Sequence, residues 1–157
     1  MQVIHLFLHI FILLMFMVRG GSCMDKWFGS SAICINEHGE LLMVLQGTPE
    51  EKKLWATPSG GKESGETFEE CCVREVKEET GYIVEIIDKL FVKQNEFVEV
   101  HYFLVKVVGG SKSIQDPDQL IYDIAWQSID DLKTLALSFP EDREFLMNLL
   151  NSELIKY

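Results

Sequence analysis

The chain has 157 residues, of which 47% are hydrophobic, and its formal net charge is −11. This length and composition suit one globular domain with a sizeable core. Such an acidic surface disfavours a nucleic-acid polymer or an anionic membrane as partner. Small phosphorylated substrates stay compatible, because a bound cation inverts the local field.

The first 23 residues form an apolar leader that we separate from a predicted domain at 24–157. Its apolar run, Val3–Val18, is short for a membrane span, which needs about 20 residues. Arg19 follows this run, whereas a secretory signal carries its basic residues before it. We favour an upstream extension outside the working protein, with Met24 as the true start. A membrane anchor or weak signal and a packed N-terminal helix are the alternatives.

Two apolar runs of strand length open the predicted domain. They are Ser31–Ile35 and Leu41–Leu45, and the residues between them, 36–39, carry turn chemistry. This pattern predicts a β-hairpin. A polar loop is predicted at Gly47–Lys53.

A glycine-rich loop at Gly60–Glu66 leads into a predicted helix. Thr67, with Glu70 three residues later, forms the pattern of a capping box at the helix start. Gly81 is a natural residue to follow the last turn, because glycine readily adopts a left-handed backbone conformation. The helix is therefore expected over residues 68–80.

This helix carries acidic residues where the physics of helices disfavours them. Glu75, Glu78 and Glu79 fall within about 100° of one face, where like charges repel. The last two also lie in the final turn, where the helix dipole disfavours anions. A solvated acidic face is the simplest interpretation. A hard divalent cation held by these carboxylates would offset both costs, which favours a functional site.

Strands predominate after the helix. Phe97–Val108 is the clearest of them, and apolar residues on both of its faces predict a central strand covered on two sides. Further strands are predicted at 82–87, 90–92 and 120–126. Ser128 then caps a short helix and Pro140 opens a last one. This element order predicts an α/β fold, an α/β/α sandwich around a mixed β-sheet.

The four cysteines show no spacing typical of a metal site. They are Cys23, Cys34, Cys71 and Cys72. We interpret them as reduced core residues of a cytosolic protein.

The 23 residues from Gly60 to Tyr82 resemble the Nudix box, the signature of the Nudix hydrolases. The fixed positions of this motif are filled by Gly60, Glu66, Arg74, Glu75, Glu78, Glu79 and Gly81. One departure is Ser59, which stands where the family usually has a glycine before the box. The resemblance implies the Nudix fold, which is the same α/β/α sandwich.

The resemblance also implies a chemistry. Nudix hydrolases cleave a nucleoside diphosphate linked to another group, using water activated by Mg²⁺ or Mn²⁺. These ions prefer oxygen ligands. The implied metal ligands are the carbonyl of Gly60 and the carboxylates of Glu75, Glu78 and Glu79.

Other roles follow from the same resemblance. Arg74 is expected to orient a box glutamate, with Glu66 the best candidate, although a surface ion pair is the alternative. Lys62 is placed to meet a phosphate of the substrate. A lysine on an exposed loop could equally have no role.

The general base is less well defined by the motif. It is either a box glutamate, Glu75 or Glu78, or an acid on a later loop. We favour Asp118 among the later acids. A simple turn at Asp116–Asp118 is the alternative interpretation of this segment. The other candidates are Asp116, Asp123, Glu96 and Glu99.

The sequence leaves the substrate open within one class. Marks typical of the ADP-ribose, dinucleoside polyphosphate, coenzyme A and NADH subfamilies are absent, which leaves a MutT-like enzyme acting on a (d)NTP or an unassigned member. The alternative is a catalytically silent Nudix domain that binds a nucleotide or a protein. We expect a cytoplasmic protein, membrane-associated only if residues 3–18 are retained, which could act as a homodimer.

Overall fold

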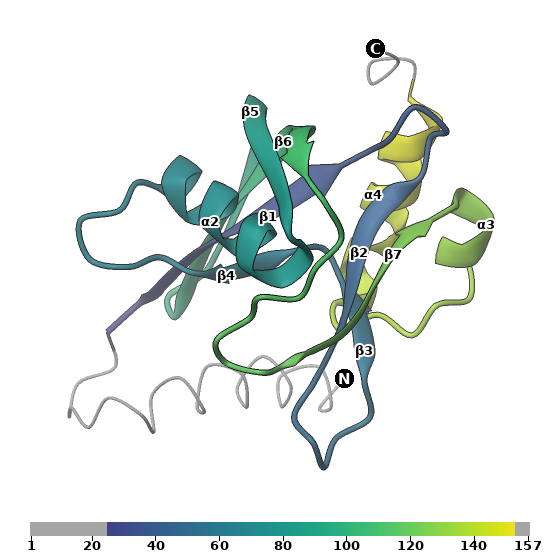
Figure 1. The fold of residues 1–157 in the computed structure, drawn as a ribbon. Helices are drawn as coiled ribbons and strands as arrows, with labels where there is room; N and C mark the ends of the chain where they lie inside the picture. Colours follow the sequence, from purple (N-terminus) through teal and green to yellow (C-terminus); the bar gives the residue numbers. More distant parts are fainter. Residues whose placement is uncertain (1–24, 153–157) are drawn as a thin grey trace.

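The structure describes residues 25–152 and is a computed structural model with two β-sheets and helices on both sides of them (Figure 1). Its elements are β1 (Trp27–Cys34), β2 (Leu41–Gln46), β3 (Leu54–Ala56), β4 (Ser59–Gly61), α2 (Phe68–Thr80), β5 (Tyr82–Gln94), β6 (Val98–Gly110), β7 (Ile121–Gln127), α3 (Ile129–Leu132), the 3₁₀ turn η1 (Pro140–Asp142) and α4 (Arg143–Asn151). The strand orders are β4-β1-β6-β5 and β3-β2-β7. The pair of β1 and β6 is parallel and the other pairs are antiparallel, so the sheet arrangement is mixed.

Side-chain alternation along the strands builds a core on each face of the sheets. In β1, Ala32 belongs to the core cluster that contains Val76 of α2. The next residue, Ile33, belongs to the opposite cluster, with Leu132 of α3 and Leu146 of α4. Helices therefore cover both faces, and the predicted α/β/α sandwich is confirmed (Figure 1).

Strand β6 is central, as its apolar pattern indicates. It lies between β1 and β5 in the larger sheet. Phe103 belongs to the core under α2, and the adjacent Tyr102 belongs to the core under α4. Both side chains are buried, so β6 is covered on two sides as expected.

Helix α2 begins and ends where its capping residues predict. The Thr67 hydroxyl accepts a hydrogen bond from the Glu70 amide at 3.1 Å, and the Glu70 carboxylate accepts one from the Thr67 amide at 2.8 Å. At the other end, Gly81 has a φ of 79° and donates its N–H to the carbonyl of Lys77. Local chemistry alone thus fixes both ends of the helix.

The predicted hairpin is wrong beyond its turn. The turn itself forms, and one bridge joins Ile35 to Leu41. The two strands then diverge into different sheets, where β1 pairs with β4 and β6 while β2 pairs with β3 and β7. Both strands carry apolar side chains on their two faces. Each can therefore lie inside a sheet that is covered on both sides, paired with strands other than its neighbour in the sequence.

Two further differences concern strand boundaries. The segments predicted at 82–87 and 90–92 form one strand, β5, whose pairing with β6 shifts register at three places. The short strands β3 and β4 were not predicted. β4 is the glycine-rich entry to α2, and its pairing with β1 is set by tertiary contact.

The cysteines within the described part of the chain are core residues. Cys34, Cys71 and Cys72 are free and buried, and burial raises the pKa of the Cys34 and Cys71 thiols to about 11. This agrees with the reduced core residues expected from the sequence. Cys23 lies outside the described residues.

The predicted leader at 1–23 also lies outside the described residues. Within residues 25–152, no helix has the length and apolar character needed to cross a membrane.

Replacing Gly81 with alanine should destabilise the protein by more than a strained backbone alone explains. A left-handed conformation costs an alanine about 1–2 kcal/mol. An added Cβ at Gly81 would also stand 2.2 Å from the carbonyl oxygen of Ser111, and such overpacking typically costs about 1–3 kcal/mol more. Urea unfolding should show this loss.

Gly39→Ala is the matched control, because Gly39 also has a positive φ, 75°, but an added Cβ there would meet nothing within 4 Å. It should show the backbone cost alone. Equal losses in the two variants would contradict the close packing at Gly81.

Candidate active site

The acidic face of α2 is turned toward the protein rather than toward solvent. Glu79 is only 6% exposed, and the side chains of Glu75 and Glu78 are 14% and 31% exposed. Carboxylates at this depth are uncommon unless they are paired or bind a cation. The interpretation of this face as a solvated helix surface is therefore wrong.

The glycine-rich strand β4 packs directly against this face. A Cβ on Gly60 would lie 2.1 Å from the Glu75 carboxyl carbon, so only glycine permits the observed approach. The Gly60 carbonyl accepts a hydrogen bond from the Cys71 thiol at 3.5 Å. The structure thus brings Gly60 and Glu75, two of the predicted metal ligands, into contact.

Arg74 joins the loop to the helix. It donates two hydrogen bonds to Glu66, from Nε to Oε1 at 2.7 Å and from Nη2 to Oε2 at 3.1 Å. Nη2 also donates to the Gly61 carbonyl at 2.8 Å. The expected contact with Glu66 is present, and its forked geometry holds the glutamate in one orientation. The Arg74 hydrogen bond also lowers the pKa of Glu66.

The same guanidinium group bridges two of the acids on its own helix. Nη1 donates to Glu75 Oε1 at 2.7 Å and to Glu78 Oε2 at 3.2 Å. These contacts reduce the repulsion between the two carboxylates.

Glu79 is held by the backbone of the loop. Its Oε2 accepts a hydrogen bond from the Ser59 amide at 3.1 Å. The serine that replaces the usual glycine contributes its backbone here, so the contact does not depend on its side chain. Burial, and next the charge of Glu75, raise the pKa of Glu79 well above its ordinary value.

Glu75 is similarly reluctant to ionise. Burial is the main reason that its pKa rises to about 7; Arg74 opposes the rise, and the charges of Glu78 and Asp118 add to it. Crowded carboxylates of this kind are typical of sites that receive positive charge.

The donor atoms suit a hard divalent cation. Glu75 Oε2, Glu78 Oε1 and Glu79 Oε1 accept no hydrogen bond within residues 25–152, and the backbone of Gly60 packs against the Glu75 carboxyl group. Oxygen atoms are the ligands that Mg²⁺ and Mn²⁺ prefer. Among the described residues, however, no three His, Cys, Asp or Glu side chains already converge as a metal-binding group. These oxygen atoms are of the kind that such an ion binds. In this structure the Arg74 guanidinium bridges Glu75 and Glu78.

The loop between β6 and β7 carries the predicted base candidates Asp116 and Asp118. The Asp116 carboxylate accepts three backbone N–H groups, from Asp118, Leu120 and Ile121. The Asp118 carboxylate is exposed and accepts no hydrogen bond within the described chain. It lies within electrostatic range of Glu75. The geometry therefore distinguishes a loop-forming acid, Asp116, from an available one, Asp118.

The other acids considered from the sequence lie in different surroundings. Asp123 pairs with Lys112 at 3.5 Å. Glu99 is held by Lys26 at 3.1 Å and by His101 at 2.9 Å. Glu96 is exposed. Asp123 and Glu99 therefore have ion-pair partners, whereas Asp118 has none among the described residues.

Lys62 is placed beside the first turn of α2. Its Nζ lies 5.8 Å from the centre of the Phe68 ring, and no contact joins it to Glu75, Glu78 or Glu79 in the described part of the chain. Its predicted contact with a phosphate stays a prediction.

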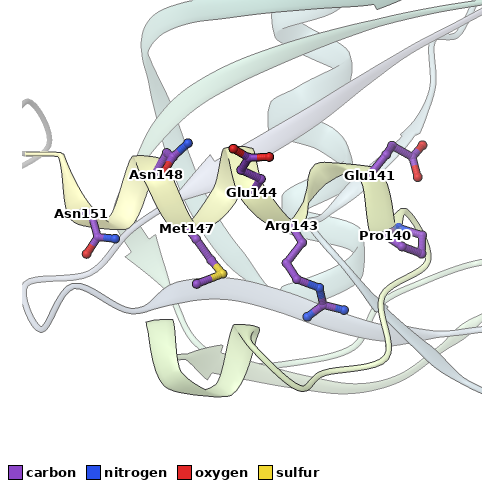
Figure 2. A pocket seen from close by; sticks show the side chains of 7 residues that line it. All are labelled: Pro140, Glu141, Arg143, Glu144, Met147, Asn148 and Asn151. Carbon is purple, nitrogen blue, oxygen red and sulfur yellow. The ribbon is translucent and has the colours of Figure 1, made fainter.

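A hollow of about 490 Å³ lies away from this acidic cluster. Figure 2 shows the side chains that line it, which extend from α4 and the turn before it. Among them Arg143 already donates to the carbonyls of Leu132 and Leu135. The hollow belongs to the opposite helical layer and contributes nothing to the cluster on α2.

Sequence reasoning missed three contacts that shape the cluster. These are the Ser59 amide on Glu79, the Gly61 carbonyl on Arg74, and the Cys71 thiol on Gly60. All three use a backbone atom, which leaves no signature in a sequence. The third also uses a cysteine at a variable position of the motif.

The comparison with protein families agrees with this geometry. The model of the NUDIX domain matches residues 27–149. The chain belongs to the Nudix family. The match spans every described element apart from the last residues of α4, so the Nudix fold predicted from the box extends over the whole described domain.

Individual relatives support the assignment. The 8-oxo-dGDP phosphatase NUDT18 of Mus musculus is 34% identical over 97 residues, covering 60% of this chain and 30% of that protein. Nudix hydrolase 5 of Arabidopsis thaliana is 30% identical over 135 residues, covering 78% and 43%. The chain thus spans less than half the length of these Nudix relatives.

A solved structure supports the fold. An ADP-ribose pyrophosphatase from Streptococcus suis superposes with a TM-score of 0.64 at 24% identity, covering 82% of this chain and 95% of that one. At this identity the likeness concerns the Nudix fold alone.

Replacing Arg74 with alanine should destabilise the metal-free protein. The Arg74 side chain is 23% exposed and Glu66 12%, so its removal leaves poorly solvated carboxylates without a partner. Loss of one partner from a buried pair costs about 3–5 kcal/mol, and we expect about 2–3 kcal/mol at this partly exposed site. Urea unfolding in the presence of a chelator would measure it.

Lys133→Ala is the control for this prediction, because Lys133 and its partner Asp130 are 57% and 81% exposed. Its loss should stay within about 1 kcal/mol. A comparable loss in both variants would show that the Arg74 network has no special role in stability.

Proposed function

We propose that the domain is a divalent-metal-dependent pyrophosphohydrolase acting on a nucleoside diphosphate-linked substrate. The single observation that supports this most is the shielded acidic face of α2, where Gly60 packs against Glu75 and where Glu75, Glu78 and Glu79 each keep one carboxylate oxygen unpaired within the described chain. Mg²⁺ or Mn²⁺ bound there would offset the charge of the diphosphate and make water a better nucleophile.

Other residues would position the metal ligands and accept the proton of the attacking water. Glu66 and Arg74 would keep the loop and the helix in register, so that Glu75 and Glu78 present their unpaired oxygens on one side. Asp118 would act as the general base, which takes one proton from the attacking water as its oxygen joins phosphorus. The phosphorus–oxygen bond of the anhydride then breaks, and the leaving phosphate departs with the bonding pair.

A nucleotide substrate is supported by the family and by one relative. The mouse relative is named as a phosphatase of 8-oxo-dGDP, an oxidised nucleoside diphosphate. We therefore place (d)NTPs and (d)NDPs, including oxidised forms, first among candidate substrates. Nucleotide sugars and dinucleotides come second.

The alternative function is a silent Nudix domain that binds a nucleotide or a protein. It has less support, because the acids of the box are all present and none of Glu75, Glu78 and Glu79 is fully exposed. A panel of (d)NTPs, (d)NDPs, dinucleotides and nucleotide sugars, assayed for phosphate or pyrophosphate release with Mg²⁺, Mn²⁺ or EDTA, tests both. Metal-dependent release from one member supports the enzyme. Binding without release supports the silent domain.

Glu78→Gln and Glu79→Gln should each lower turnover while leaving the fold intact. Each change removes a negative charge that is expected to hold the metal. A bound metal ion stabilises the charge of the transition state by several kcal/mol. That corresponds to a fall in kcat/KM on the order of 100- to 1000-fold. Steady-state kinetics and circular dichroism would measure the two effects.

Glu69→Gln is the matched control, since Glu69 is an exposed glutamate in the first turn of the same helix. It should keep the wild-type rate. Near-normal rates in both the Glu78 and Glu79 variants would refute the proposed metal site.

A further inference from the structure

The carboxylate of Asp116 organises the backbone of the loop between β6 and β7. Its Oδ1 accepts the Asp118 amide at 3.0 Å, and its Oδ2 accepts the amides of Leu120 and Ile121 at 2.6 and 3.1 Å. The Asp116 carbonyl accepts the Gln119 amide at 3.3 Å. One residue therefore fixes most of the backbone that surrounds Asp118.

The start of the same loop is tied to α2. The Gln115 amide donates to the Glu78 carbonyl at 2.7 Å, and the Ser113 amide donates to the Thr80 carbonyl at 2.8 Å. The final carbonyls of a helix lack partners within it, so the loop supplies the donors that these two need. These two bonds set the position of the loop relative to α2, and Asp116 then folds the part of the loop that follows.

The backbone within the fold is strained at one point. Gln119 has a φ of 56°, and it is the one non-glycine residue with a positive φ among the described residues. Such a conformation costs free energy and persists only where its surroundings impose it. The hydrogen bonds to Asp116 on either side of Gln119 are what impose it here.

The hydrogen bonds of Asp116 restrict the backbone on both sides of Asp118. The exposed carboxylate of Asp118 accepts no hydrogen bond within residues 25–152, yet it lies within electrostatic range of Glu75. A freely moving loop would hold it there only part of the time. A base delivers its full effect only when it is held in place, and a misplacement of 1 Å can cost about 100-fold in rate.

We propose that Asp116 is a positioning residue, which folds the β6–β7 loop and so holds the carboxylate of Asp118 within electrostatic range of Glu75. This inference rests on the proposed function, in which Asp118 is the general base. Asp116 itself would touch neither substrate nor metal, because both of its oxygens are occupied by backbone amides.

The test is a double-mutant cycle on kcat. Asp118→Ala should lower kcat by about 100-fold or more, as loss of a general base does. Asp116→Ala should lower kcat by about 10- to 100-fold, with a smaller change in KM. In the Asp118→Ala background, Asp116→Ala should have almost no further effect. Equal effects in both backgrounds, or a normal kcat in either single variant, would overturn the proposal.

The cycle also separates this role from an effect on the metal ligands. The negative charge of Asp116 reaches Glu79 and contributes to raising its pKa. A loss of rate that arose through Glu79 would persist when Asp118 is absent. Asp116→Asn, which keeps the shape and one acceptor oxygen, should fall between wild type and Asp116→Ala.

Asn36→Ala supplies a matched control. The Asn36 Oδ1 accepts the amides of His38 and Glu40, two and four residues later, at 3.0 and 2.9 Å. This is the same loop-forming pattern in the turn between β1 and β2. The variant should lose stability like Asp116→Ala, but keep kcat. An equal fall in kcat would show that any loosened loop gives the effect.

Amide hydrogen exchange gives a readout that does not require turnover. In the metal-free protein, the amides of Leu120 and Ile121 should exchange slowly in wild type and at least about tenfold faster in Asp116→Ala. Unchanged exchange overturns the proposal even if the enzyme is active. If no substrate of the panel is hydrolysed but exchange rises, the proposed function fails while the loop-folding role of Asp116 holds.

Discussion

The arrangement of the acidic cluster depends on the contacts of one guanidinium group. Arg74 reaches Glu66 at the end of the glycine-rich loop, the Gly61 carbonyl at its start, and Glu75 and Glu78 on the helix. A planar fork with five donors can satisfy such divergent acceptors at once, whereas a lysine could not. Without it, the loop would lose its main polar contact with the helix, and the carboxylates would face one another unscreened.

Close packing and charge act together in this cluster. Gly60 lets β4 approach until it touches Glu75, and this approach also buries the carboxylate and raises its pKa to about 7. Glu79 lies deeper still and is held by a single backbone amide. Folding therefore places negative charge where water solvates it poorly, a cost that a bound cation would offset. Metal affinity and loop geometry should be coupled for this reason.

The second loop reaches the cluster through the end of α2. Gly81 turns the chain out of the helix and leaves room for Ser111 and Ser113 to pass, and the amides of Ser113 and Gln115 then bind the final carbonyls of α2. Segments that are more than 30 residues apart in the sequence thus meet at the helix terminus. Polar backbone groups that the helix leaves unpaired provide the attachment.

The sequence by itself determined α2, its two ends and the identity of the acids on its face, because capping, helix period and the box spacing are local properties. It also determined the sandwich, since alternating and two-sided apolar strands allow few layer arrangements. Only the tertiary structure decided that β1 and β2 diverge after the turn, that Ser59–Gly61 pairs as a strand, and that Asp118 rather than Asp116 has a free carboxylate. Each of these depends on backbone hydrogen bonds between distant segments. Such bonds involve groups that every residue carries, so the identity of the side chains does not reveal them.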